Sequence, residues 1–301
     1  MLTKERLEER LNFVTGSDAS VICGVSPWGN IVELWKQKTR QTTAIDISDK
    51  PSVRAGVYLE PVVRQWFSDL TGKNVSTDER LLIHQNIPHM AASIDGRVVS
   101  DNAVFEAKTA GWTKGWGEDG ENIIPDYYLC QVAHYMAVTD CERAYVAVLI
   151  SGNDFRWYTI ERDMRLEETI IKMEKDFWDL VKSKTPPAPR TSDEIISLYG
   201  YESDSDPITS NFKVEHALSD LRSTKIAIKE AQEKQKELEE TIKIYMGKHN
   251  TLANKDGKIL ASWNPTKPSR RFDSKVFKED QPELYGQYLS ETKPQRRFLI
   301  K

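Results

Sequence analysis

Two acidic residues and a lysine stand where a β-hairpin could bring them together. Asp95 lies in one segment of strand composition, Glu106, Ala107 and Lys108 lie in the next, and the turn-forming residues 100–102 separate them. Because side chains alternate across a strand, Glu106 and Lys108 should share a face that Asp95 can reach across the turn. Two carboxylates beside a lysine can hold a hydrated Mg²⁺ and orient an attacking water. The pattern predicts a metal site for phosphodiester hydrolysis.

The same three side chains have a simpler alternative as a solvated strand face. Charges that alternate along a strand usually form weak cross-strand pairs. Exposed ion pairs contribute little to stability. Taken alone, the hairpin favours this alternative, so the metal-site hypothesis depends on the rest of the chain.

The surrounding pattern predicts the elements that would position these residues. A polar segment, residues 40–56, is expected to separate an early helical region from an amphipathic helix closed by Gly72. The order of elements predicts an α/β (α+β) fold with a mixed sheet flanked by helices, in a core over residues 1–185. Helices are expected over 3–12, 26–39, 57–72, 125–138 and 165–184, and strands around 79–84, 89–99, 103–110, 142–150 and 154–163.

The composition changes after residue 185. Residues 186–211 are rich in proline and acidic side chains, which predicts a linker or a surface wrap. From Phe212 to about Met246, an imperfect heptad spacing favours a long helix packed on its own protein over a coil that binds a partner. Residues 263–301 hold nine Lys and Arg against five Asp and Glu. We therefore expect a helical and basic extension over 212–301.

Composition limits the class of protein. The 301 residues are 39% hydrophobic and 29% charged, as expected of a globular protein. A net charge of −4 argues against a uniformly basic nucleic-acid coat but allows a local one. No apolar run is long enough to span a bilayer, and the first residues predict a charged helix, so we expect no membrane association and a cytoplasmic location. Three scattered cysteines suggest neither a disulfide framework nor a zinc site.

Four further residues extend the metal-site hypothesis. Glu60 should face the hairpin from the helix before it, and Gln131, on the helix after it, could orient a water or contact DNA. Ser17 starts a predicted short helix where an anion could bind, and Arg10 could hold the same phosphate. Each has an ordinary alternative as a surface or helix-edge side chain. Trp28, Trp35, Trp112 and Trp116 lie in or beside loops, where they could stack on bases or pack in the core.

Five segments together resemble a known family. GSDASVICGVSPWGNIVELW, GVYLEPVVRQWF, HMAASIDGRVV, FEAKTA and YLCQVAHYM are similar, in order and spacing, to YqaJ-like viral recombinases. These belong to the lambda-exonuclease branch of the PD-(D/E)XK nuclease superfamily. The resemblance covers roughly residues 5–160. One departure is that Ile94 replaces the proline that often precedes the first aspartate of that motif.

The resemblance implies a role for each candidate residue. Asp95 and Glu106 would be carboxylate ligands of Mg²⁺, with the carbonyl of Ala107 as a further ligand. Lys108 would position the nucleophilic water. The remaining roles are metal binding directly or through water for Glu60, support of the water or the scissile phosphate for Gln131, and binding of the 5′-phosphate for Ser17 and Arg10.

The family's activity follows as an expectation. It is a Mg²⁺-dependent (or Mn²⁺-dependent) 5′→3′ exonuclease that acts on double-stranded DNA ends and leaves 3′ single-stranded overhangs for phage-type homologous recombination. The resemblance also implies a homo-oligomeric ring, with a trimer expected, and a single-strand annealing protein as partner. Three cysteines cannot supply the four ligands of an iron–sulfur cluster. The alternatives are a restriction-type or structure-selective PD-(D/E)XK endonuclease and a non-catalytic DNA-binding or annealing protein.

Overall fold

The chain folds into two compact units, Met1–Gly200 and Tyr201–Lys301. A computed structural model describes residues 4–43, 47–77, 80–118, 120–201, 206–292 and 295–300. The candidate residues all lie in the first unit, so each unit is described by itself.

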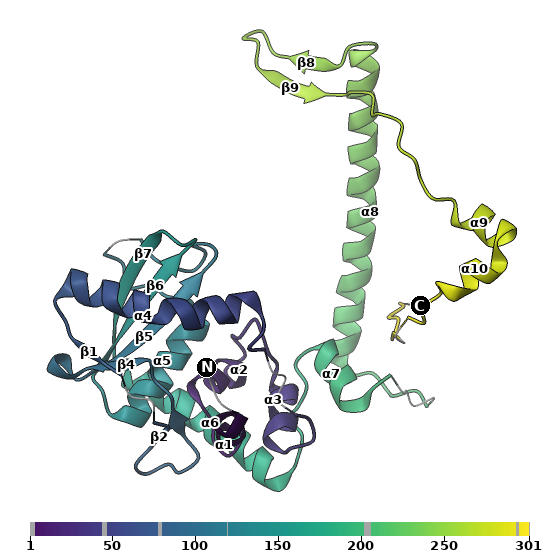
Figure 1. Cartoon of the computed structure of the whole chain (residues 1–301). Helices are drawn as coiled ribbons and strands as arrows, with labels where there is room; N and C mark the ends of the chain where they lie inside the picture. The colour runs from purple at the N-terminus through teal and green to yellow at the C-terminus, as the bar shows by residue number, and fades with distance from the viewer. Residues whose placement is uncertain are drawn as a thin grey trace. The chain divides into compact units, whose positions relative to one another are not determined.

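A five-stranded sheet in the order β1-β4-β5-β6-β7 forms the centre of the first unit (Figure 1). Its neighbours pair antiparallel except β5 and β6, which are parallel. Parallel neighbours need a crossover, and α5 (Asp126–Thr139) provides it. This mixed sheet with flanking helices confirms the predicted fold class. The strands are β1 (Val75–Ser76), β4 (Gly96–Val98), β5 (Ala103–Ala110), β6 (Arg143–Ile150) and β7 (Asp154–Glu161).

Helices cover both faces of this sheet. On one face, Phe105 of β5 packs with Val63 and Phe67 of α4 (Pro51–Thr71), the helix that crosses the strands in Figure 1. On the other face, Val104 packs with Met136 of α5. Alternate residues of β5 therefore lie in different core layers, so the side chains of Glu106 and Lys108 belong to the α5 side.

Further helices complete the first unit around α5. α2 (Gly16–Ile22) packs against α5 and against α6 (Met164–Ser183), and α3 (Ile31–Lys38) packs against α6. α1 (Lys4–Arg10) precedes them. Phe177 of α6 and Trp35 of α3 share one apolar cluster, which fixes α2 and α3 beside the sheet.

Several predicted boundaries differ from the structure, among them that of α3, which begins at Ile31 rather than at residue 26. α4 begins at Pro51 rather than at residue 57, because proline fits the first turn of a helix, where no backbone N–H is needed. The predicted strand over 89–99 is broken into β3 (Ala91–Ala92), which pairs with β2 (Leu82–Ile83), and β4. The break lies where the Asp95 side chain, instead of a main-chain carbonyl, accepts the Ala107 N–H. Residues 44–46 and 78–79, within segments predicted above, lie outside the described residues.

The predicted linker over 186–211 contains a helix, α7 (Ser192–Tyr199). Thr191 and Glu194 form a reciprocal cap at its start. Its Ser197 hydroxyl accepts a hydrogen bond from Lys36 Nζ of α3 at 2.9 Å. Arg190 Nη1 also donates to the carbonyl of Ile22 at 3.1 Å. These contacts extend the compact unit to Gly200, beyond the predicted boundary at residue 185.

Truncation should show whether the first unit ends at residue 185 or at Gly200. A chain that ends at residue 201 keeps α7 and its contacts with α3, so we expect thermal unfolding similar to that of the first unit in the full-length protein. A chain that ends at residue 185 loses Arg190 and α7, and we expect it to be less stable by a few kcal/mol, because packing and several partly buried hydrogen bonds are removed. Circular dichroism melts of both chains test this. Equal melting temperatures would mean that α7 contributes nothing to the first unit.

The second unit contains one long helix, α8 (Phe212–Met246), with the predicted bounds. Among the described residues of this unit, Met246 is the buried side chain of α8, so most of the helix has no packing partner within its own unit. Lys293 and Lys301 of the basic tail lie outside the described residues. Across the described parts of both units, none of the helices combines the length and apolar character that a bilayer crossing requires. The remaining elements are a hairpin of β8 (Thr251–Ala253) and β9 (Ile259–Ser262), then α9 (Ser274–Asp280) and α10 (Pro282–Gln287).

Candidate active site

The predicted hairpin forms between β4 and β5. Gly96 pairs with Phe105, and the 3₁₀ turn Val99–Asp101 joins the strands. Asn102 ends the turn with φ 44°, a left-handed conformation that asparagine tolerates better than most residues. This turn places Asp95 beside the middle of β5.

Four predicted residues meet on this hairpin and on α5. Lys108 Nζ donates to Glu106 Oε1 at 2.6 Å and to Gln131 Oε1 at 3.2 Å. Gln131 Nε2 donates to the same Glu106 oxygen at 2.8 Å. Asp95 Oδ2 accepts the Ala107 N–H at 2.9 Å. Glu106 is only 3% exposed, so these side chains do not form the solvated strand face that was the alternative.

One carboxylate oxygen of this group has no partner among the described residues. Glu106 Oε2 is buried and accepts no hydrogen bond from them. Burial and the neighbouring Asp95 carboxylate raise the pKa of Glu106 to about 8, although Lys108 opposes the shift. A buried acceptor without a donor is unfavourable, and two close carboxylates favour a bound positive charge. The unpartnered oxygen and the hard carboxylate donors fit a Mg²⁺ or Mn²⁺ ion.

Lys108 remains an ammonium in this setting. Burial opposes its charge, but Glu106 and Asp95 more than compensate and raise its pKa. Its Nζ also lies over the ring of Tyr128, 4.6 Å from the centroid. The cation is thus held in one place by a carboxylate, an amide and a ring face.

Glu60 lies at the edge of this group. Its Oε1 accepts from Arg64 Nη2, one helical turn along α4, at 2.7 Å. Burial and Asp95 raise the pKa of Glu60, and Arg64 opposes the shift. Among the residues that the structure describes, no three acidic, histidine or cysteine side chains lie close enough together to hold one metal ion. Glu60 is thus engaged by Arg64, and Asp95 and Glu106 stay the candidate direct ligands.

The two residues predicted to bind a phosphate are in contact. Arg10 Nη2 donates to Ser17 Oγ at 2.9 Å and to Thr15 Oγ1 at 3.1 Å. Asp18 holds the start of α2 in place, because its Oδ2 accepts from the Thr15 N–H at 2.8 Å and from Lys38 Nζ at 2.6 Å. Burial alone would raise the pKa of Asp18, but Lys38 and Arg10 hold it below its usual value. The exposed Ser17 hydroxyl and the Arg10 guanidinium can face one anion together.

Tyr135 connects the segment of Ser17 to the carboxylates, and no role was predicted for it from the sequence. Its hydroxyl accepts from Gln131 Nε2 at 2.8 Å. The sequence did hold a signal for this contact, because residues four apart on a helix, such as Gln131 and Tyr135, lie on one face. Its ring lies against Gly16, where an added Cβ would be 2.3 Å from Tyr135 Cε1. The neighbouring His134 instead contacts Glu174, with Nδ1 and Oε1 2.7 Å apart.

Substitution of Gly16 tests this link. We expect Gly16→Ala to displace the Tyr135 ring and, through Gln131, the acceptor network of Glu106, because the new methyl group overlaps the ring. The DNA hydrolysis that the resemblance implies should fall by about tenfold or more, since misplacement by an ångström has effects of this size. Gly29→Ala is the matched control, because its added Cβ would meet Val21 at an ordinary 3.4 Å. Equal activity of both variants would show that Tyr135 does not position the site.

One cavity of about 800 Å³ connects these groups. Asp95, Glu106, Lys108 and Gln131 line it, and Ser17 lies on the same cavity. It is large enough for a nucleotide-sized ligand. Glu60 and Ala107 also line it, and the role of the Ala107 carbonyl as a ligand stays a prediction.

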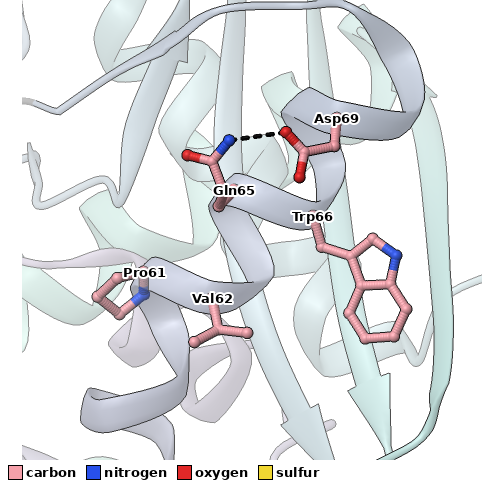
Figure 2. Close-up of a pocket in the computed structure, with 5 residues that line it drawn as sticks. All are labelled: Pro61, Val62, Gln65, Trp66 and Asp69. Carbon is pink, nitrogen blue, oxygen red and sulfur yellow. Dashed lines mark hydrogen bonds between the residues drawn. The ribbon is translucent and has the colours of Figure 1, made fainter.

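A second, more open pocket lies on the exposed side of α4, and its polar side chains, unlike Glu106 of the first cavity, are not buried. Figure 2 shows Pro61, Val62, Gln65, Trp66 and Asp69 around it. Gln65 Nε2 donates to Asp69 Oδ1 at 2.7 Å, so its main polar groups satisfy each other. The buried Glu106 carboxylate lines the cavity beside β5 instead, and that cavity is the candidate site.

The sequence of this chain is similar to a known protein family and, along its whole length, to one known protein. The YqaJ-like viral recombinase domain matches residues 6–142. The uncharacterized protein YqaJ of Bacillus subtilis (strain 168) is 34% identical over 314 residues, covering 100% of this chain and 95% of that protein.

Solved structures also resemble the chain, at lower similarity. An alkaline exonuclease from Laribacter hongkongensis is 23% identical with a TM-score of 0.49, covering 61% of this chain and 94% of that one. A phage-related exonuclease from Haemophilus somnus 129PT is 14% identical with a TM-score of 0.41, covering 57% of this chain and 96% of that one. On the match to YqaJ along its whole length, this chain belongs to the YqaJ-like viral recombinase family.

Proposed function

We propose that this protein is a Mg²⁺-dependent exonuclease that degrades one strand of duplex DNA from its 5′ end and leaves a 3′ single-stranded overhang for recombination. The observation that carries the proposal is the buried Glu106 oxygen that has no partner among the described residues, beside Asp95 and the Lys108 ammonium. Membership of a viral recombinase family supports DNA as the substrate. The burial of these charges argues against a non-catalytic surface.

Asp95 and Glu106 would hold the cation, with the Ala107 carbonyl as a further ligand and Glu60 acting through a bound water. When bound there, Mg²⁺ supplies a water of lowered pKa and neutralises charge on the phosphate. Mn²⁺ has the same preference for oxygen ligands and can substitute. The protein's own contribution is to fix these oxygens before the substrate arrives, which the hydrogen bond from the Ala107 N–H does for Asp95.

Lys108 and Gln131 would place the attacking water. Lys108 Nζ has one donor bond to Glu106 and one to Gln131, which leaves a third proton for a water or a phosphate oxygen. The Gln131 amide is held from the other side by Tyr135, so its orientation is fixed. The pair can therefore aim a nucleophile without moving.

A cleavage assay tests the proposed function. Linear blunt duplex, covalently closed circular duplex and single-stranded DNA are incubated with the protein, with and without Mg²⁺. We expect shortening of the linear duplex only when Mg²⁺ is present, and an intact closed circle. Cleavage of the closed circle would instead identify an endonuclease, and no divalent-dependent cleavage of any substrate would reject a nuclease.

A phosphate at the 5′ end should accelerate degradation. Ser17 lines the cavity and Arg10 Nη2 donates to its hydroxyl, so a 5′-phosphate bound beside Ser17 would gain charge-assisted hydrogen bonds that a 5′-hydroxyl lacks. We expect Arg10→Ala to lower the rate on 5′-phosphorylated duplex by about tenfold and to remove the preference over 5′-hydroxyl ends. Arg40→Ala is the control, because Arg40 pairs with Glu8 and is half exposed. Equal rates of the wild type on both ends would argue against this phosphate site.

The assembly is a separate part of the proposal. A trimeric ring around the duplex would keep an acidic protein on its substrate by topology. A single-strand annealing protein would be the partner that receives the 3′ overhang. Sedimentation of the full-length protein tests the trimer, and a monomer at working concentration would contradict it.

A further inference from the structure

A row of aromatic rings runs from the surface into the candidate site. Trp28 lies edge-on to Tyr127, with centroids 4.7 Å apart, and Tyr127 lies edge-on to Tyr128 at 4.5 Å. We call these three residues the aromatic wall. Behind it, Trp116 packs on Tyr128 with centroids 5.5 Å apart and is buried. The wall is therefore supported from the core side.

The outer end of this row is open to solvent. Trp28 is 70% exposed although Tyr127 holds its ring, and Trp112 on the same cavity is 74% exposed. Core packing, the ordinary use of tryptophan, explains Trp35 and Trp116 but not these two. Two exposed tryptophans beside one cavity indicate a ligand with flat apolar surfaces.

The wall adjoins the groups proposed to cleave DNA. Tyr128 lies beneath the Lys108 ammonium, and Tyr127 and Tyr128 stand one helical turn before Gln131. Lys50 and Lys114, both exposed, line the same cavity. Aromatic faces beside lysines match the bases and phosphates of single-stranded nucleic acid.

We propose that the aromatic wall and Trp112 form a stacking subsite for unpaired nucleobases at the 5′ end of the strand being degraded. The inference rests on the proposed function, because that function brings a DNA strand to Glu106. Bases in a duplex are stacked on each other, so the subsite would hold nucleotides that have left the helix. Lys50 and Lys114 would contact the phosphates between them.

A coupling experiment tests the subsite in the full-length chain. The substrates are duplexes whose 5′-phosphorylated strand ends in three unpaired nucleotides, either intact or abasic at one of these positions. Binding is measured by fluorescence anisotropy with Mg²⁺ in the Asp95→Asn protein, with and without Trp28→Ala. At one of the three positions, we expect base removal to weaken binding about tenfold when Trp28 is present and to have no effect after Trp28→Ala.

The controls separate a local from a general effect. Trp66→Ala removes a tryptophan that stacks on Phe155 away from the cavity, and it should leave binding and coupling unchanged. Independent effects of base and ring at all three positions would overturn the subsite. So would unchanged binding after Trp28→Ala, the result expected if a protein partner covers the wall. The wild type is assayed in parallel for Mg²⁺-dependent hydrolysis of the intact substrate. Hydrolysis without coupling rejects the subsite alone, whereas absent hydrolysis rejects the proposed function.

Discussion

Asp95→Asn and Glu106→Gln are each expected to lower Mg²⁺-dependent DNA hydrolysis by about a thousandfold or more. Each change removes a negative charge from the pair that would hold the cation, and groups that act as a unit in catalysis lose most of their effect together. After Asp95→Asn, the amide side chain still offers an oxygen to the Ala107 N–H, so the hairpin should stay intact. Initial rates on linear duplex, with circular dichroism to verify folding, measure the effect.

The control for these variants is an acidic residue outside the cavity. Glu161→Gln changes a side chain that is largely exposed and lies 3.5 Å from Arg143, so its rate should equal that of the wild type. The double variant of Asp95 and Glu106 should lose little more than either single variant, because one ion needs both. Substantial activity in either single variant would reject this pair as the metal site.

Much of this site was predictable because its residues lie on regular elements. Strand alternation placed Glu106 and Lys108 on one face, and their contact at 2.6 Å agrees. The order of helix, hairpin and helix along the chain also predicted that Gln131 would lie near Glu106, and it donates to the same Glu106 oxygen. Arg10 and Ser17 meet because a short helix is followed directly by another, which keeps their separation small.

What could not be predicted depends on tertiary contacts. The bend at Asp95 has no sequence signal, because its cause is a hydrogen bond to Ala107 on another strand. Likewise, the sequence around Gly16 indicates only the start of a helix, whereas its contact with the Tyr135 ring depends on the tertiary structure. α7 has a recognisable cap in Thr191 and Glu194, but the proline-rich sequence around it favoured a linker. Its packing on α3 makes this segment part of the first unit.

Cation affinity should depend steeply on pH. Burial and Asp95 raise the pKa of Glu106 to about 8 in the metal-free protein, and a cation binds the ionised form. Below pH 8 the ionised fraction falls tenfold per unit, so the Mn²⁺ affinity should rise about tenfold per pH unit from 6 to 8 and then level. Calorimetric titrations in buffers of different ionisation enthalpy should show close to one proton released per ion at pH 6.5. A flat affinity from pH 6 to 9 would contradict the shifted carboxyl.

The same carboxyl should make the metal-free fold sensitive to alkali. Its folded pKa lies above the ordinary value of 4.5, so the folded state holds a proton that the unfolded chain has released between these pH values. Stability is therefore highest at low pH in this window and falls as pH rises through it, by up to about 1.4 kcal/mol per unit. Glu106→Gln has no such proton, and in chelator at pH 8 it should unfold at a higher denaturant concentration than the wild type while remaining inactive. Saturating Mn²⁺ should reverse that order, because the ion stabilises the wild type alone. If Glu106→Gln instead unfolds earlier in chelator, the buried carboxylate stabilises the fold, and the free oxygen is not a site held ready for a cation.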